Sequence, residues 1–239
     1  DISDHLSLKS ITAYRDLESE FGRDGDHSAH TISEFVDLME QDQFTQEFQL
    51  TGSSASGSLN WILGAYYFEE SGNNVNLLDF TVSRFRSGGR FDNEATAFYA
   101  QGTWDFNEAW SLTLGLRYTD ETKEFLPDQI IFENKFAGSG HPQLDAPFMQ
   151  AGGRILPFLK KKIDISETTP LATLSYQFSD DLMTYITYSE GFKSGGFSQR
   201  VFPPVIAPFT APAGTPDIDL IPTFDPEFVK VWELGFKYT

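Results

Sequence analysis

The side chains best suited to bind a metal ion lie in one short stretch near the start of the chain. Asp24, Asp26, His27 and His30 fall within seven residues, and carboxylate and imidazole groups are suitable ligands for a divalent metal. A flexible acidic loop brings such residues together without binding anything. The stretch is therefore a candidate metal site beside that simpler interpretation, and no cofactor is predicted.

The other residues that could do chemistry lack the motifs of an enzyme. Ser189 and the four histidines are not part of a G-x-S-x-G motif. Gly191, Gly195 and Gly196 lack the following helix and the Lys-Ser/Thr ending of a phosphate loop, so a turn is the better interpretation. The basic run at 160–162 could touch lipopolysaccharide phosphate or an anionic ligand, or form a solvated loop. We predict no enzymatic activity.

Composition excludes several classes of protein. The 239 residues include 23 Phe, 9 Tyr and 4 Trp, so the chain is not a disordered polar tail. A formal net charge of −18 argues against nucleic acid as a partner, because phosphate binding needs a basic surface. Without cysteine there is no disulfide or thiolate metal site. No apolar run approaches the roughly 18 residues of a membrane-spanning helix, which leaves a β-barrel as the only membrane option.

The clearest structural element is a hairpin from Glu94 to Glu124. In its second arm, apolar side chains occupy every second position from Trp110 to Tyr118, which predicts a β-strand with one apolar face. An aromatic residue stands at each end of this aliphatic stripe, as at the two interfaces of a membrane. Both arms reach the roughly 9 to 11 residues that a tilted strand needs to cross a bilayer.

Eight strands of this kind are predicted along the chain. They cover residues 5–17, 43–52, 59–69, 94–106, 110–124, 168–178, 182–192 and 228–238. Short turns at 53–57, 107–109 and 179–181 alternate with long connections at 18–42, 70–92, 125–166 and 194–225. In the acidic connection 18–42, the helical spacing of Phe35, Leu38 and Met39 predicts one or two turns of helix. Within 70–92, residues 75–86 still alternate, which predicts strands that extend beyond the membrane.

Tight turns at one rim and long loops at the other are typical of outer-membrane barrels. The predicted fold is therefore all-β: an antiparallel transmembrane β-barrel segment of about eight strands, with short periplasmic turns and long extracellular loops. Two alternatives remain open. One is a small closed outer-membrane barrel, porin-like or a hydrolase, and the other is a soluble all-β binding domain.

Several runs of sequence resemble one family. Residues 188–197 read YSEGFKSGGF, and residues 224–227 and 232–237 read FDPE and WELGFK. Together they resemble the later barrel strands of TonB-dependent outer-membrane receptors. Three further runs follow in the family's order: LKSITAYR at 8–15, QEFQL at 46–50 and LGLRYT at 114–119.

The resemblance implies a large plugged barrel, of about 22 strands in such transporters, in the bacterial outer membrane. Members import scarce nutrients, most often ferric siderophores, with energy relayed by the protein TonB. The family's plug domain, TonB-contacting segment and closing C-terminal strands are missing from this sequence, so we expect residues 1–239 to be part of the β-barrel domain of a longer receptor. The implied partners are outer-membrane lipid and lipopolysaccharide, TonB through the missing N-terminal segment, and a small-molecule ligand such as a ferric siderophore.

Alternation assigns the strand residues to two faces. Lipid-facing candidates are Leu112, Leu114, Trp232 and Leu234. Lumen-facing candidates are Tyr99, Gln101, Arg117, Glu121, Lys123, Glu233 and Lys237. The lumen-facing residues would form ion pairs across strands or with a plug, or would contact a passing solute directly. We expect ligand specificity to come from the long loops, because binding residues usually lie on loops held by a rigid scaffold.

Overall fold

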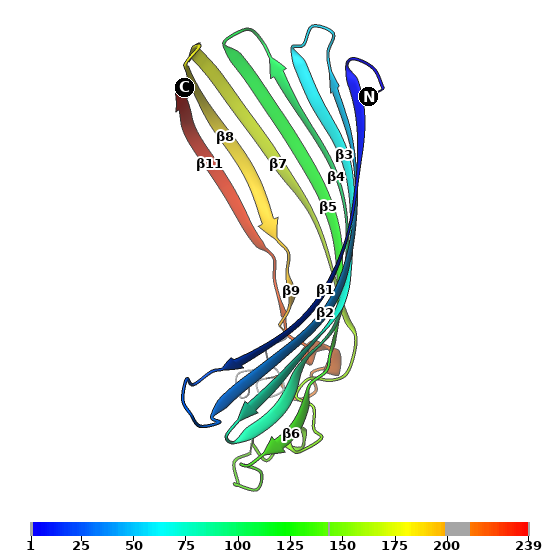
Figure 1. The fold of residues 1–239 in the computed structure, drawn as a ribbon, viewed down its shortest axis with the longest axis vertical. Helices are drawn as coiled ribbons and strands as arrows, with labels where there is room; N and C mark the ends of the chain where they lie inside the picture. The colour runs from blue at the N-terminus through cyan, green and yellow to red at the C-terminus, as the bar shows by residue number, and fades with distance from the viewer. Residues whose placement is uncertain (1, 143, 199–210, 239) are drawn as a thin grey trace.

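The computed structural model of the chain is built around one broad antiparallel sheet, and it describes residues 2–142, 144–198 and 211–238 (Figure 1). Eight long strands follow one another in the order β1-β2-β3-β4-β5-β7-β8-β11, and a ninth, β6, pairs with β4. The strands are β1 (Leu6–Asp24), β2 (Ser33–Ser53), β3 (Leu59–Phe80), β4 (Ser83–Asp105), β5 (Trp110–Pro127), β6 (Ile130–Asn134), β7 (Lys161–Ser179), β8 (Leu182–Lys193) and β11 (Glu227–Tyr238). The predicted all-β antiparallel fold is confirmed.

Four small elements complete the description. β9 (Gly196–Phe197) and β10 (Thr223–Phe224) pair as a separate two-stranded sheet, and η1 (Pro147–Met149) and η2 (Asp217–Leu220) are short 3-10 helices. Across the described ranges, no helix is long and apolar enough to cross a membrane.

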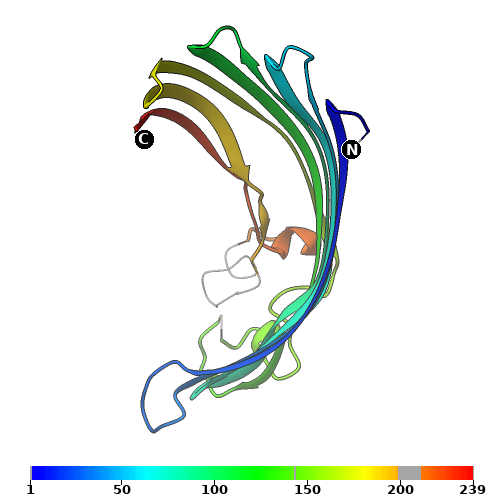
Figure 2. The same cartoon turned by 45° about the horizontal axis from the view of Figure 1, so that its top comes forward.

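The large sheet is strongly curved and open. Figure 2 shows it as an arc, with β9 and η2 inside the curve. β1 and β11 are the two edges of the sheet, and they do not pair with each other. The chain therefore forms a stretch of curved wall and not a closed eight-stranded barrel.

The three predicted short turns are confirmed. β2–β3, β4–β5 and β7–β8 are joined through residues 54–58, 106–109 and 180–181, at the end of the sheet that also holds both termini (Figure 1). In the turn at 106–109, the side-chain oxygen of Asn107 accepts hydrogen bonds from the backbone N–H groups of Ala109 and Trp110, at 2.9 and 3.0 Å. This side-chain bonding favours the tight turn over a longer loop.

The prediction of a long acidic connection at 18–42 is wrong. β1 continues to Asp24 and β2 begins at Ser33, so only residues 25–32 join them. The predicted helical turns are also wrong, because Phe35, Leu38 and Met39 lie in β2, paired with β3. Continuous backbone pairing between β1 and β2 outweighs the acidic composition that suggested a loop.

The predicted strand extension within 70–92 is confirmed, and it is longer than expected. β3 runs to Phe80 and β4 starts at Ser83, so a two-residue turn replaces the long connection. Longer stretches outside the large sheet do occur within 125–166 and 194–225. Of the second, residues 199–210 lie outside the described residues.

The packed core lies at the far end of the sheet from the short turns, where residues 130–142 and 144–156 fold against the extended strands. Its buried members, in which no side chain is more than 8% exposed, are Leu78, Phe85, Ile131, Met149, Ile155 and Leu156. Three partly buried rings, Phe35, Phe80 and Phe148, pack against them. Away from this cluster most of the sheet is a single layer, so its two faces decide what the chain can do.

Candidate functional site: the two faces of the sheet

Strand register sorts the side chains, because residues directly opposite each other on neighbouring strands point to the same face. Leu50, Leu63, Ala100 and Leu116 form one such row across β2 to β5. A second row crosses β4 to β11 and consists of Trp104, Leu112, Leu174, Ile186 and Leu234. The convex face of the sheet therefore carries a continuous apolar band.

This apolar band is uncovered. Leu114, Trp232 and Leu234 are 54%, 72% and 79% exposed, so no second sheet or helix layer of the described chain packs on them. A contiguous apolar surface of this size needs an apolar environment. The four predicted lipid-facing residues all lie in the band, with Leu112 opposite Trp104 and Leu174.

Aromatic residues border the band at both ends. Toward the short turns they are Trp104, Phe106, Trp110, Tyr176, Phe178 and Tyr238, and toward the other end they are Tyr14, Phe44, Phe98, Tyr118, Tyr188 and Trp232. Rings of neighbouring strands are in contact, since the ring centroids of Trp110 and Tyr176 lie 4.6 Å apart and those of Tyr188 and Trp232 lie 4.8 Å apart. Two aromatic borders around an aliphatic band are typical of a transmembrane β-barrel.

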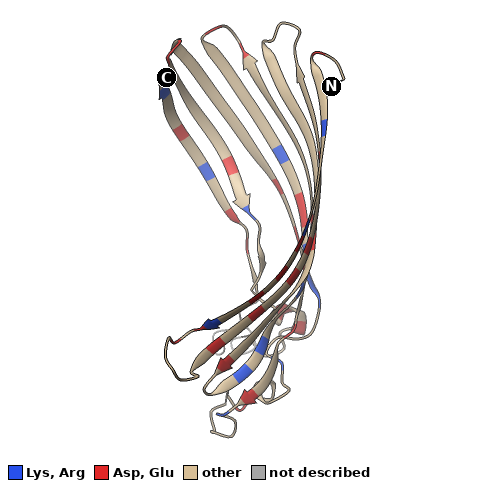
Figure 3. Cartoon of the chain, in the orientation of Figure 1, with Lys and Arg blue, Asp and Glu red and all other residues tan. Residues whose placement is uncertain are grey.

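Beyond the second border the convex face becomes acidic, and we call this region the acidic collar. Figure 3 shows acidic residues gathered on the halves of β1 to β4 that lie away from the short turns. Asp16 lies directly opposite Asp42, and Glu18 lies directly opposite Glu40. Because directly opposed like charges destabilise a sheet, these residues are suited to a water-facing surface.

The concave face is identified by what touches it. Glu121 accepts a hydrogen bond from Ser194, and Lys123 donates one through Nζ to the carbonyl oxygen of Gly195 at 3.1 Å. Glu121 and Lys123 also form an ion pair at 3.2 Å. Residues 194–195 lead into β9, which lies inside the curve of the sheet (Figure 2).

By register, all seven predicted lumen-facing residues lie on this concave face: Tyr99, Gln101, Arg117, Glu121, Lys123, Glu233 and Lys237. The structure divides them into groups. Tyr99 lies directly opposite Arg117, while Glu121 and Lys123 hold the segment before β9. Glu233 and Lys237 lie on the edge strand β11, where Glu233 accepts a hydrogen bond from Tyr185. That this face borders an aqueous lumen stays a prediction.

Tyr99 is the centre of a polar cluster that reaches across four strands. Its hydroxyl donates a hydrogen bond of 2.6 Å to Glu47 on β2, passing over Gly64 on β3. A Cβ on Gly64 would lie 2.0 Å from the Tyr99 ring, so only glycine lets the ring lie flat there. Arg117 on β5 then reaches back, with Cζ 5.8 Å from the Tyr99 ring centroid and 5.7 Å from that of Tyr66.

Sequence reasoning missed Glu47, Gly64 and Tyr66 as members of this cluster. Each lies on the polar or mixed side of its predicted strand, but alternation does not say which residues meet across strands. Gly64 lies directly opposite Tyr99 in the β3–β4 pairing, but the sequence predicted a long connection between these strands and so did not give their register. A glycine facing a tyrosine across a strand pair is the signal that could have found the cluster.

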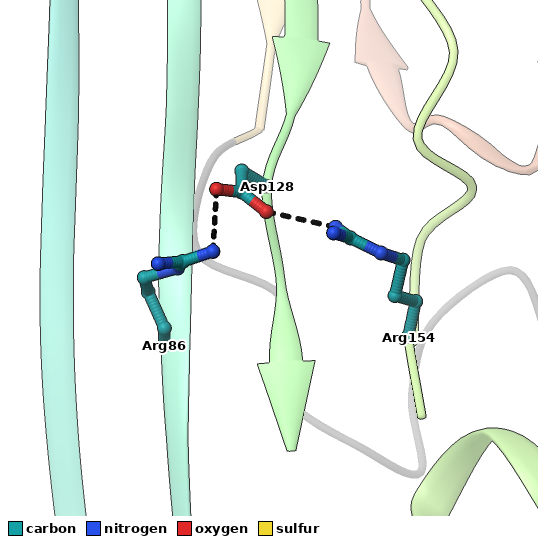
Figure 4. Close-up of polar contacts among 3 residues, drawn as sticks. All are labelled: Arg86, Asp128 and Arg154. Carbon is teal, nitrogen blue, oxygen red and sulfur yellow. Dashed lines mark hydrogen bonds and ion pairs between the residues drawn. The ribbon is translucent and has the colours of Figure 1, made fainter. Parts of the chain in front are cut away.

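A second polar site holds the segment after β5 against the extended strands. Asp128 accepts a hydrogen bond and ion pair from Arg86 at 2.6 Å and another from Arg154 at 2.8 Å (Figure 4). Burial raises the pKa of Asp128, but the hydrogen bonds and positive charges of Arg154 and Arg86 outweigh burial and hold the pKa below its ordinary value. The guanidinium of Arg154 also lies 4.6 Å from the ring centroid of Phe158.

The candidate metal site is not formed. Asp24 accepts hydrogen bonds from the backbone N–H groups of Asp26 and His27, and Asp26 accepts them from those of Ser28 and Ser33. The two carboxylates therefore stabilise the turn between β1 and β2. Among the described residues, no group of three or more His, Cys, Asp or Glu side chains is arranged to hold a metal ion.

The basic run is engaged within the chain. Lys160 pairs with Glu124 at 2.7 Å, Lys162 pairs with Asp164 at 3.0 Å, and Lys161 donates to the carbonyl oxygen of Ile221 at 2.9 Å. Lys161 and Lys162 belong to β7, so only Lys160 lies in a loop, and the side chains of Lys160 and Lys162 stay about half exposed. The glycines at 195 and 196 allow close approach of Phe224, because a Cβ at either would lie within 2.7 Å of it.

Comparison with known proteins agrees with this geometry. A family model described as "TonB dependent receptor-like, beta-barrel" matches residues 1–239. Among solved structures, the ferric yersiniabactin uptake receptor FyuA of Yersinia pestis aligns with a TM-score of 0.73 at 15% identity, over 99% of this chain and 31% of that chain. The ferric preacinetobactin receptor BauA of Acinetobacter baumannii aligns with a TM-score of 0.62 at 18% identity, over 100% of this chain and 33% of that chain.

At these identities the two structures establish the fold alone, and the chain spans about a third of the length of each. The family assignment rests on the match to the whole chain, on the resemblance of residues 188–197 and on the uncovered apolar band with its aromatic borders. The chain is an outer-membrane protein and belongs to the TonB-dependent receptor-like β-barrel family.

Proposed function

We propose that this chain is part of the barrel wall of a receptor that imports a scarce nutrient, a ferric siderophore above all, across the outer membrane with energy supplied through TonB. The family match over residues 1–239 supports this proposal. The names of FyuA and BauA, which describe receptors for ferric compounds, favour iron over other nutrients.

The observation that carries the proposal is the opposite character of the two faces. The convex face is apolar and uncovered, with Leu114 and Trp232 more than half exposed, which suits contact with lipid chains. The concave face carries Arg117, Glu121 and Lys123, whose charges suit water, a solute or another protein segment. A wall of this kind separates a membrane from a polar passage.

In this proposal, residues 1–239 are one part of the β-barrel domain of a longer receptor that also has a plug domain and closing C-terminal strands. The edges β1 and β11 then pair with further strands of the same barrel, which removes two exposed rows of backbone groups. TonB would act through an N-terminal segment, and lipid and lipopolysaccharide would surround the convex face. The wall would hold and guide a ligand without catalysing a reaction.

The test is iron uptake by cells that carry the full-length gene or its deletion. Uptake of radioactive iron as a panel of ferric chelates is measured with the gene present, with the gene deleted, with TonB deleted, and after the proton gradient is collapsed. We expect one chelate to need the gene, TonB and the gradient together. If the uptake of every chelate is unchanged when the gene is deleted, the proposal is contradicted.

Neither alternative function is favoured by a specific observation. A small closed barrel, porin-like or a hydrolase, needs the first and last strands to pair, and β1 and β11 do not. A soluble all-β binding domain needs a covering layer over its apolar face, and Leu234 is 79% exposed.

A further inference from the structure

Arg117 is half-buried, yet its hydrogen-bonding capacity is largely unused. Its Nε donates to the hydroxyl oxygen of Thr119 at 3.2 Å. To the described residues the guanidinium makes no other hydrogen bond and no ion pair. Two parallel Nη donors in a partly desolvated place normally have an acceptor, and the planar guanidinium fork matches the two oxygens of a carboxylate.

The surroundings keep this fork open and in place. Tyr66 and Tyr99 bring their rings within 5.7 and 5.8 Å of the Arg117 Cζ, which stabilises the cation and limits its movement. Ala97 on β4, which lies directly opposite Tyr66 on β3 and Thr119 on β5, is 1% exposed and small enough for side chains to meet above it. The cation therefore faces the concave side of the sheet.

The carboxylate of the cluster, on Glu47, already accepts hydrogen bonds from other residues. Glu47 accepts a hydrogen bond from the Tyr99 hydroxyl at 2.6 Å and another from Gln49 at 3.0 Å. Both hydrogen bonds engage the Oε1 atom of Glu47, and among the described residues Glu47 makes neither a hydrogen bond nor an ion pair with Arg117. Tyr99 thus has two effects, because its ring flanks the cation and its hydroxyl binds the neighbouring carboxylate.

We propose that Arg117, flanked by Tyr66 and Tyr99, is a binding site for a carboxylate that comes from outside the described chain. The carboxylate belongs either to an anionic ligand in transit or to a protein segment that fills the barrel. This inference deepens the proposed function and rests on it for access to the concave face.

The direct test is the experimental structure of the full-length receptor, determined without ligand and with ferric citrate as a carboxylate-rich probe. We expect both oxygens of one carboxylate to lie about 3 Å from the two Nη atoms of Arg117. A protein carboxylate found there without the probe identifies the internal source, and citrate found there identifies the ligand. A fork that contacts only water or the wall in both structures overturns the inference.

Three variants give an independent measurement in the detergent-solubilised receptor. Arg117→Gln removes the charge, and Arg117→Lys keeps the charge but removes the planar fork. Where citrate is the partner, both should weaken its binding about 10- to 100-fold, as for a hydrogen bond to a charged group. Where the partner is a carboxylate of the receptor itself, Arg117→Gln and Arg117→Lys should both lower the denaturant concentration at the midpoint of unfolding. Arg84→Gln, on the convex face and paired with Asp79 at 3.0 Å, should change either quantity far less.

A rescue experiment separates binding from general damage. Tyr99→Phe keeps the ring but removes the hydroxyl that binds Glu47, so Glu47 can compete for the guanidinium of Arg117. Tyr99→Phe alone should therefore also lower whichever quantity Arg117→Gln lowers, the citrate affinity or the unfolding midpoint. Adding Glu47→Gln removes the competitor and should restore that quantity, which a merely structural role of Tyr99 does not predict. Failure of the restoration, or an Arg117→Gln variant that matches Arg84→Gln in both measurements, overturns the carboxylate site. Absence of TonB-dependent uptake counts only against the proposed function.

Discussion

Placing an arginine at Leu114 should destabilise the barrel in its membrane. Leu114 lies midway between Trp110 and Tyr118, which are eight residues apart. At about 3.4 Å per residue and a tilt near 45°, that stretch of strand spans about 19 Å along the membrane normal, with Leu114 at its centre. An arginine on the lipid face at this depth costs about 2 to 4 kcal/mol. The equilibrium between folded and unfolded protein should therefore shift by about 30- to 700-fold.

Gln101 provides the matched control, since it is exposed and lies opposite Gly115, one position along from Leu114, but on the concave face. The full-length receptor is refolded into lipid vesicles, and denaturant unfolding is followed by tryptophan fluorescence for Leu114→Arg and Gln101→Arg. We expect Gln101→Arg to cost less than about 1 kcal/mol, because the side chain stays in polar surroundings. Equal costs for the two variants would refute the assignment of the faces.

Three further outcomes are expected in the same receptor. Asp128→Asn should lower the free energy of unfolding by about 1 to 3 kcal/mol. Because the pKa of Asp128 is lower in the folded than in the unfolded protein, this stabilisation is present above the unfolded pKa of about 3.9 and is lost as the pH falls through the folded pKa. The melting temperatures of wild type and variant should therefore converge in acid. Glu18→Gln, which removes the repulsion with Glu40, should raise stability by about 0.2 to 1 kcal/mol at low salt, and a gain that persists in about 1 M salt would contradict an electrostatic cause. Leu156→Ala, at a fully buried position, should cost about 2 to 5 kcal/mol and speed protease cleavage within 135–160, whereas unchanged cleavage would mean that the core does not hold this segment.

The membrane part of the fold was predictable because its chemistry is simple. From Trp110 to Tyr118, apolar and polar side chains alternate strictly, so strand type, pairing and turn positions could be predicted from the sequence. Beyond the aromatic borders the extended strands carry polar and charged residues on both faces, and part of them packs against the segment after β5. Alternation then carries less information, and the acidic residues after Asp16 were wrongly assigned to a loop although they pair along all of β1.

The candidate site was only partly predictable for a different reason. Alternation placed Tyr99 and Arg117 on one face, but the contact between Tyr99 and Glu47 crosses an intervening strand and depends on Gly64 being small. Likewise, Arg86, Asp128 and Arg154 come from segments whose approach is fixed by the packed core around Leu156. Contacts such as those of Tyr99 with Glu47 and of Asp128 with its two arginines depend on strand register and loop packing, which local sequence patterns do not predict.

The acidic collar bears on how densely the protein can occupy a membrane. Below the collar, the apolar bands of two neighbouring copies do not repel each other, because their side chains are uncharged. At the level of Asp16, Glu18 and Asp42, however, two copies drifting together would bring like charges within the roughly 8 Å over which such charges interact at physiological salt. We therefore expect the collar to act as a lateral spacer, one that keeps lipid between copies and loses strength as salt rises.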